Sequence, residues 1–221
     1  MGDQGFGISQ DMLDHVSREI ADAVKLGVQV GVVVGGGNFF RGLAGAAQNM
    51  DRVSADQIGM LATAMNSLAV AENLARHGIQ AAVLSSIRLG TFTEPFSRRL
   101  ADRYLETGKV VVFAAGTGNP FFTTDTAASL RAVEIGADVL LKATQVDGVY
   151  DSDPQSNPDA VRYDKISFDE VLQRQLGVMD LTAITLCREN NMPVQVFALR
   201  SDGALGRILR GEKEGTLVSS A

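Results

Sequence analysis

The sequence predicts an α/β protein with a mostly parallel central sheet sandwiched between two layers of helices. Amphipathic helical segments and apolar, β-branched segments alternate along nearly the whole chain, and this alternation is typical of βαβ units. Several strand segments, such as VQVGVVV at 28–34, are runs rich in β-branched residues, as expected when both faces of a sheet are covered. No stretch resembles a linker between independent domains, so we expect a single domain over residues 1–221.

Helix-capping residues and glycines set the boundaries of the expected elements. Ser9 is expected to cap the first helix and Gly27 to end it, whereas Ser54 and Gln57 form a capping-box pattern that opens a long helix ended by Gly78. The expected elements are, in order, helix 10–26, strand 28–37, helix 54–76, strand 81–86, helix 95–106, strand 109–116, helix 125–135, strand 137–144, helices 168–175 and 182–190, strand 193–199, helix 204–210 and strand 216–219.

The composition indicates a folded, cytoplasmic protein. The chain is 45% hydrophobic and 21% charged, which favours a packed core over disorder. Its net charge of −6 argues against non-specific binding to nucleic acid. No apolar run has the length of a membrane span and no signal-type segment opens the chain. The single Cys187 excludes an intramolecular disulfide and is expected to be a buried core residue rather than a nucleophile.

Three polar or glycine-rich segments follow predicted strands. They are GGGN at 35–38, GTGN at 116–119 and TQVDG at 144–148. Ligands of parallel sheets bind beyond the carboxyl ends of the strands, so we expect these three strand ends to converge on one cleft. Glycine lets backbone N–H groups approach a phosphate, and the start of the helix after 116–124 is a second anion site, with Thr123 or Thr124 as its cap. The simpler interpretation is an ordinary tight turn and an ordinary capped loop.

The common nucleotide and metal motifs are absent. A Walker A motif fails because the only Gly-Lys pair, at 108–109, is followed by Val110. A dinucleotide fingerprint fails because Phe121 stands where the third glycine is required. The acidic segment from Asp151 lacks the turn glycine of a calcium loop, and the two histidines are isolated. No metal-ligand set is therefore expected from the protein.

Several motifs, in order and with matching spacing over nearly the whole chain, resemble the bacterial uridylate kinases (UMP kinases) of the amino acid kinase superfamily. The motifs are GGGNFFRG, RVSADQIGMLATAMNSLA, TGNPFFTTD, KATQVDGVY, VMDLTA and GEKEGTLV. The resemblance implies an amino acid kinase-like fold and transfer of the ATP γ-phosphoryl group to UMP, giving UDP and ADP in de novo pyrimidine nucleotide (CTP) biosynthesis. It also implies Mg²⁺ carried on the nucleotide phosphates, and a homohexamer activated by GTP and inhibited by UTP.

The resemblance also assigns roles to residues, motif by motif. The implied UMP-binding residues are Gly36, Asp56, Thr117, Gly118, Asn119, Pro120, Phe121, Phe122, Thr123 and Thr124. The implied ATP-binding residues are Gly37, Arg41, Thr144, Tyr150 and Asp153. The implied catalytic residues are Asp125, Lys142, Arg41 and Asp180. The implied GTP-responsive region is Gly2, Asp3, Gln4, Gly5, Phe6 and Gly7.

Simpler explanations exist for several of these residues. Asp56 is also explained as a complement to a helix dipole, Tyr150 as a packing residue and Asp153 as a turn residue. The aromatic pair 121–122 is explained either as a hydrophobic wall and subunit contact or as part of the core. Lys142 lies within an apolar strand, where a buried ammonium group requires an anionic partner.

The chain departs from the family at its start. The family begins with a strand and a loop of the kind LLKLSGEAL directly before the counterpart of GDQGFG, and this chain starts inside that region. We therefore expect the chain as written to lack a phosphate-contacting lysine and a central strand, and to be impaired in catalysis. A mis-assigned start codon and a genuine truncation both account for this, and the N-terminal mass of the native protein distinguishes them.

Two alternative functions follow from these residues. The first is a catalytically impaired, regulatory subunit that binds UMP or GTP, which the departure at the start of the chain favours. The second is a carboxylate or carbamate kinase of the same superfamily. PFFTT at 120–124 argues against the second, because it offers aromatic rings and hydroxyls where a carboxylate acceptor needs cations.

Overall fold

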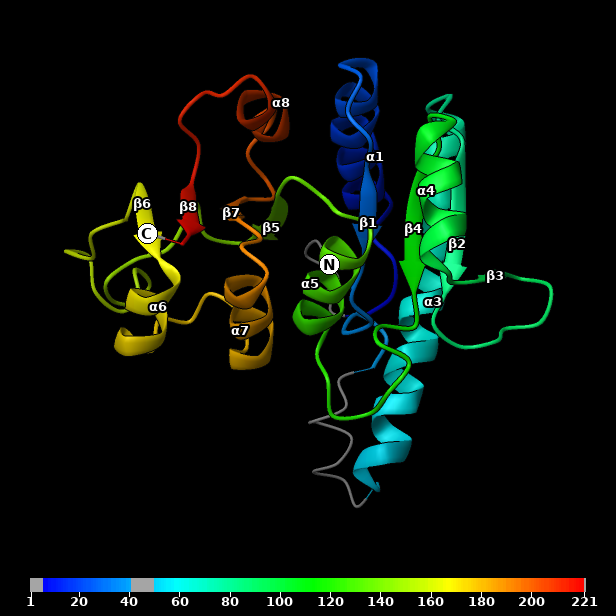
Figure 1. Ribbon diagram of the computed structural model, residues 1–221, viewed down its shortest axis with the longest axis horizontal. Helices are drawn as coiled ribbons and strands as arrows, with labels where there is room; N and C mark the ends of the chain where they lie inside the picture. The colour runs from blue at the N-terminus through cyan, green and yellow to red at the C-terminus, as the bar shows by residue number, and fades with distance from the viewer. Residues whose placement is uncertain (1–5, 41–49, 221) are drawn as a thin grey trace. The chain divides into compact units, whose positions relative to one another are not determined.

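The computed structural model describes residues 6–40 and 50–220. The chain divides into two compact units, Met1–Ala127 and Ala128–Ala221, and each unit contains one four-stranded sheet. Figure 1 shows the elements of both units. Among the predicted site residues, Gly2, Asp3, Gln4, Gly5 and Arg41 lie outside the described residues.

The first unit is a parallel sheet with helices packed against it. Its strands lie in the order β1-β4-β2-β3 and every pair is parallel. The elements are α1 (Gln10–Lys25), β1 (Gly31–Val33), α3 (Arg52–Arg76), β2 (Ala81–Ser85), β3 (Glu94–Pro95), α4 (Arg98–Glu106), β4 (Val110–Ala114) and the first residues of α5 (Thr124–Glu134).

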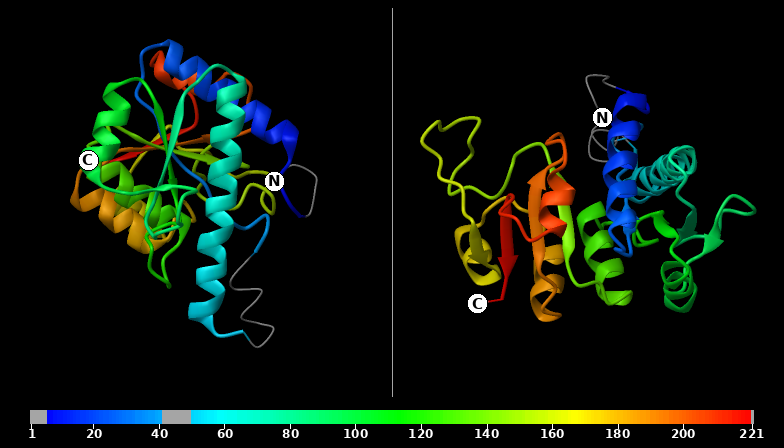
Figure 2. Two further views of the ribbon diagram at one scale, coloured as in Figure 1. Left: turned by 90° about the vertical axis from the view of Figure 1, so that its right-hand side faces the viewer. Right: turned by 90° about the horizontal axis from the view of Figure 1, so that it is seen from above.

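Strand β4 is the centre of the first unit's core, since all five of its residues are buried. On one face, Val110 and Val112 pack with Ile20 of α1 and Leu74 of α3, two helices that lie against each other (Figure 2). Side chains alternate along a strand, so Phe113 points to the other face, where the Phe96 ring lies 5.7 Å away between centroids. The continuous apolar run therefore reflects burial on both faces, as predicted.

The second unit has a mixed sheet. Its strands lie in the order β5-β7-β8-β6, with β7 and β8 antiparallel and the other pairs parallel. Its core contains the buried side chains of Phe168, Val171, Ile184 and Val194. The elements are β5 (Leu140–Thr144), β6 (Lys165–Ser167), α6 (Phe168–Arg174), α7 (Leu181–Glu189), β7 (Val194–Ala198), α8 (Ala204–Leu209) and β8 (Thr216–Ser219).

The predicted α/β class with mostly parallel strands is confirmed, with corrections to some boundaries. The Ser54–Gln57 capping box is wrong: the side chain of Asp51 accepts a hydrogen bond from Ser54 N at 3.1 Å and α3 starts at Arg52. Helix α4 likewise starts after its cap Ser97 and not at residue 95. The strand expected at 28–37 is only three residues long. Two short strands, β3 and β6, were not predicted.

Cys187 is fully buried, as predicted. Burial raises the pKa of its thiol, while a contact of 3.3 Å with Ser129 Oγ acts in the opposite direction.

Among residues 6–40 and 50–220, no helix combines the length and apolarity needed to cross a bilayer.

Candidate functional site

The loop that follows β4 has an unusual backbone conformation. Ala115, Gly116, Gly118 and Phe121 all have positive φ angles, of 63°, 57°, 79° and 71°. Glycine adopts this conformation freely, whereas each of the two other residues costs about 1–2 kcal/mol. Such strain persists only where the surroundings hold it, and it is most frequent at functional sites. We call residues 115–124 the acceptor loop, because they include most of the residues predicted to bind UMP, the phosphoryl acceptor.

Side chains from neighbouring elements hold the start of the acceptor loop. The hydroxyl of Thr63 on α3 accepts a hydrogen bond from Ala115 N at 2.8 Å. Ser86, directly after β2, donates from its hydroxyl to Gly116 O at 2.7 Å. A Cβ at Gly118 would lie 3.1 Å from Ser86, so this glycine is also required for close packing. The loop is therefore anchored to both α3 and the end of β2.

The middle of the loop is held by its own polar groups and exposes its aromatic rings. The Thr117 hydroxyl lies 3.2 Å from both the N and the O of Asn119. Phe121 is 64% exposed and Phe122 is 50% exposed. Burial in the core of the chain therefore does not explain the two rings.

Thr123 is the cap of α5, one of the two residues predicted for this role. Its hydroxyl oxygen accepts hydrogen bonds from Asp125 N at 3.1 Å and from Thr126 N at 3.2 Å. Thr124 is the first helical residue, and a Cβ added at Gly35 would lie 3.5 Å from its hydroxyl. The segment after β1 and the start of α5 are therefore adjacent, and a helix N-terminus favours an anion.

Asp56 joins helix α3 to the acceptor loop. Its Oδ2 atom accepts a hydrogen bond from Phe121 N at 2.8 Å, and Arg52 Nε lies 2.9 Å from both carboxylate oxygens. The Asp56 side chain is only 15% exposed. The carboxylate thus has a structural role in fixing the loop that a helix-dipole explanation does not cover.

Gly36 is required by packing against α3. A Cβ at Gly36 would lie 2.7 Å from Gly59 O, 2.8 Å from the Ala62 Cβ and 3.1 Å from Thr63 N. Because Thr63 also holds the start of the acceptor loop, the ends of β1 and β4 meet at the same part of α3. The structure therefore brings together the predicted acceptor residues Gly36, Asp56 and 117–124.

The described end of the predicted GTP-responsive region lies against the glycine-rich turn. Asn38 and Gly7 exchange two hydrogen bonds, from Gly7 N to Asn38 O and from Asn38 Nδ2 to Gly7 O, each at 3.0 Å. The rings of Phe6 and Phe39 meet edge to face with centroids 5.6 Å apart. Gly37, predicted to bind ATP, lies in this turn.

The predicted ATP-side residue Tyr150 belongs to a polar cluster in the second unit. Its hydroxyl donates to Asp147 Oδ1 at 2.6 Å, and Arg162 Nη1 donates to Asp147 Oδ2 at 2.6 Å. The hydrogen bond from Tyr150 holds the pKa of Asp147 below its ordinary value, and the same bond raises the pKa of the tyrosine. The cluster fixes the orientation of the tyrosine ring.

The other two described ATP-side residues shape turns. The Thr144 hydroxyl lies 2.6 Å from Val146 O and 3.0 Å from Val146 N, at the end of β5. The Asp153 carboxylate accepts a hydrogen bond from Gln155 N at 2.9 Å. A turn role for Asp153 is therefore present in the structure, as its simpler explanation requires.

The described residues predicted to be catalytic are divided between the two units. Asp125 lies in the first turn of α5, in the first unit. In the second unit, Lys142 is half-buried in β5, and Asp180 is the N-cap of α7, accepting a hydrogen bond from Ala183 N at 3.0 Å. Convergence of the 144–148 segment with the two strand ends of the first unit stays a prediction.

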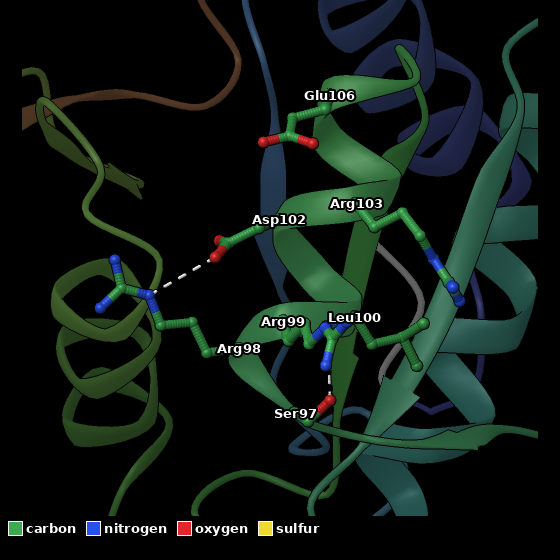
Figure 3. Close-up of a pocket in the computed structure, with 7 residues that line it drawn as sticks. All are labelled: Ser97, Arg98, Arg99, Leu100, Asp102, Arg103 and Glu106. Carbon is green, nitrogen blue, oxygen red and sulfur yellow. Dashed lines mark hydrogen bonds and ion pairs between the residues drawn. The ribbon is translucent and has the colours of Figure 1, made fainter.

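A surface pocket lies on α4. Figure 3 shows that it is lined by one helix and its cap, with Arg98 Nε 3.5 Å from Asp102 Oδ2. None of its seven lining residues is a predicted site residue. Among the described residues, no group of three or more His, Cys, Asp or Glu side chains is arranged to hold a metal ion.

Sequence reasoning missed the residues that hold the loop, namely Arg52, Thr63 and Ser86. Thr63 was detectable in principle, because it is a hydroxyl residue in the otherwise apolar stretch LATAM. Arg52 and Ser86 carry no such signal, since each contacts a segment distant in the sequence.

Comparison with known proteins decides the family. The sequence profile of the amino acid kinase family matches residues 2–198. The chain belongs to the amino acid kinase family. The family resemblance seen in its motifs is therefore confirmed.

Three solved structures are similar to this family member. The UMP kinase from Bacillus anthracis is 39% identical, with a TM-score of 0.96 over 99% of this chain and 90% of that chain. The UMP kinase from Ureaplasma parvum is 38% identical, with a TM-score of 0.91 over 96% and 91%. The uridylate kinase from Archaeoglobus fulgidus is 29% identical, with a TM-score of 0.76 over 96% and 94%.

Proposed function

We propose that this protein is a UMP kinase that transfers the γ-phosphoryl group of ATP to UMP, giving UDP and ADP for pyrimidine nucleotide synthesis in the cytoplasm. The acceptor loop carries the proposal: a strained, glycine-containing segment is anchored by Thr63, Ser86 and Asp56 and leads into the start of α5. The similarity to two bacterial UMP kinases over nearly the whole chain supports it.

The acceptor loop is proposed to hold UMP through backbone and hydroxyl groups. Thr123 preserves the helix start as its cap, so that the hydroxyl and the N–H group of Thr124 at the positive end of the helix dipole receive the acceptor phosphate. Asp56 uses its remaining acceptor capacity for ribose hydroxyls, since a carboxylate has about four acceptor positions. Phosphoryl transfer needs accurate positioning and neutralised charge more than covalent help from the protein.

The donor side is proposed to consist of the glycine-rich turn with Gly37 and Arg41, and of Thr144, Tyr150 and Asp153. Lys142 is proposed to stabilise charge on the transferred group, with Asp125 and Asp180 organising its surroundings. Mg²⁺ is proposed to arrive on the nucleotide phosphates, which supply oxygen ligands and whose charge it neutralises. GTP is proposed as an activator acting through residues 2–7, and UTP as an inhibitor.

Turnover of alternative acceptors tests this proposal. The native protein is expected to form ADP with ATP and UMP, more slowly with CMP and not with carboxylate acceptors. No turnover of UMP by the native protein, with its N-terminus established by mass spectrometry, would refute the proposal. Binding of UMP or GTP without turnover would instead support a regulatory subunit. Turnover of a carboxylate would support a carboxylate or carbamate kinase.

A Thr124→Val substitution tests the acceptor assignment. Valine has the shape of threonine but no hydroxyl, and Thr123 still caps the helix, so we expect the KM for UMP to rise about tenfold with little change for ATP. Steady-state kinetics with each substrate varied in turn measure both constants. Thr91→Val, at an exposed position, is the matched control. A larger effect on ATP than on UMP would mean that the loop is assigned to the wrong substrate.

The homohexamer implied by the resemblance has a candidate contact on α3. Ile58, Leu61, Met65 and Leu68 are between 37% and 49% exposed and recur at the spacing of coiled-coil a and d positions. In an antiparallel pair of α3 helices, Ile58 would face Leu68 and Leu61 would face Met65. This stripe is therefore self-complementary, as a twofold interface requires. We propose that a second copy of the chain covers it.

A Leu61→Glu substitution tests this contact. The expected result is a smaller assembly, because the twofold axis brings two unpaired carboxylates into an apolar contact. Size-exclusion chromatography with light scattering measures the mass. Phe92→Glu, which replaces a 74% exposed ring outside the stripe, is expected to retain the native mass. A monomeric native protein, or an unchanged mass for the Leu61 variant, would contradict the proposal.

A further inference from the structure

Arg52 occupies a position that is unfavourable for the helix it opens. It is the first residue of α3, and no acidic residue lies in that turn. A cation at a helix N-terminus opposes the helix dipole. Its ion pair with Asp56 also has the less favourable order, with the cation four residues before the anion. Local helix stability therefore does not explain an arginine here, and residues that violate local rules are frequent at functional sites.

The Arg52 side chain contacts both Asp56 of its own helix and the acceptor loop. Its Nε atom is 2.9 Å from both Asp56 oxygens, and its guanidinium carbon is 5.8 Å from the centre of the Phe121 ring. The same Asp56 carboxylate accepts the hydrogen bond from Phe121 N. Arg52 thus contacts both the Asp56 carboxylate and Phe121, whose backbone is strained. Phe121 lies 65 residues after Asp56 in the chain.

We propose that Arg52 is a positioning residue that sets the acceptor loop for the acceptor nucleotide through Asp56 and Phe121. The identity of the nucleotide rests on the proposed function, whereas the positioning role of Arg52 rests on the geometry alone. Arg52 does not contact the reacting atoms. It fixes the carboxylate plane so that Oδ2 faces Phe121 N, and the guanidinium over the ring favours the left-handed conformation of Phe121.

The planar guanidinium is the property that matters in this arrangement. The Nε–H group of Arg52 is shared between both carboxylate oxygens of Asp56. The ammonium group of a lysine, on a flexible side chain, reproduces this arrangement poorly. At 40% exposure, Arg52 is accessible to solvent, so its ion pair by itself contributes little to the free energy of unfolding. Removing it should therefore affect the loop far more than the fold.

The test compares Arg52→Met with Arg52→Lys and with Arg76→Met. Arg76 is a matched control, because it is also an arginine on α3 in an i,i+4 ion pair, with Glu72, but it lies at the other end of the helix. For Arg52→Met we expect a rise of about tenfold in the KM for UMP, a smaller fall in kcat and an unchanged KM for ATP. Arg52→Lys should lie between the native protein and Arg52→Met, and Arg76→Met should match the native protein.

A second measurement does not depend on turnover. Hydrogen exchange at the Phe121 amide of the ligand-free protein is expected to be about tenfold faster in Arg52→Met, because the acceptor carboxylate is no longer held. Unchanged exchange would overturn the positioning inference, even if UMP is turned over. Equally fast exchange at the Phe121 amide in Arg76→Met would also overturn the positioning inference, because the substitutions would then act by destabilising helix α3 as a whole. Faster exchange without any UMP turnover would refute only the proposed substrate.

Discussion

Replacing Lys142 with methionine is expected to lower kcat about a hundredfold or more, because a cation that stabilises transition-state charge contributes several kcal/mol to catalysis. Lys142 is half-buried in β5, in the middle of an otherwise apolar run. Methionine keeps an unbranched, apolar stem that is one heavy atom shorter, and it removes the ammonium group with its charge and its hydrogen-bond donors. The KM for UMP should change little, since Lys142 is proposed to stabilise charge that develops in the transition state rather than to bind UMP. A coupled assay for ADP measures both constants.

Lys165→Met is the control for this experiment. Lys165 lies in a strand of the same sheet but is exposed to solvent, and we expect native kinetics from its variant. Circular dichroism of both variants verifies that the fold is retained. A Lys142 variant that turns over UMP at the native rate would remove this residue from the proposed catalytic set.

Gly36→Ala is expected to destabilise the protein by about 2–4 kcal/mol, through overpacking between backbone segments that cannot move apart freely. The added Cβ would lie 2.7 Å from Gly59 O and 2.8 Å from the Ala62 Cβ. Since Gly59 O is a backbone atom within α3, relief requires the whole turn to shift. Urea denaturation of the native protein and the variant measures the change in the free energy of unfolding.

Gly59→Ala gives a control from the same contact. A Cβ at Gly59 meets no atom within 4 Å, and alanine is favoured over glycine within a helix by about 1 kcal/mol. We therefore expect this variant to be at least as stable as the native protein. A Gly36 variant with native stability would mean that the glycine serves ligand approach alone, whereas the expected loss shows that packing already requires it.

The segments predicted best are those whose structure can be recognised from consecutive residues alone. The run around Val110–Ala114 is apolar at every position because both faces of β4 are covered, so the pattern indicates a buried strand without reference to any other part of the chain. Thr123 was likewise a predicted cap, since capping depends on residues two or three positions away.

The errors arose where several local signals compete. The Ser54–Gln57 pattern predicts a helix start at Ser54, but an aspartate caps a helix as well as a serine does, and the structure has Asp51 as the cap, which places Arg52 at the first helical position. The two short strands, Glu94–Pro95 and Lys165–Ser167, have too few residues for a periodic pattern and form through pairing with β2 and β8. Pairing of this kind depends on distant segments, which periodicity does not report.

The sequence by itself determined the α/β class, the family and the segments that carry the proposed chemistry, because these follow from local periodicity and from ordered motifs. Only the tertiary structure decided how the acceptor loop is held. The hydroxyl of Thr63, the carboxylate of Asp56 and the guanidinium of Arg52 stabilise positive φ angles at Ala115 and Phe121 from 52 to 69 residues away. The physical reason is that a strained backbone is stable only when other elements supply its hydrogen bonds, and folding alone brings these elements together.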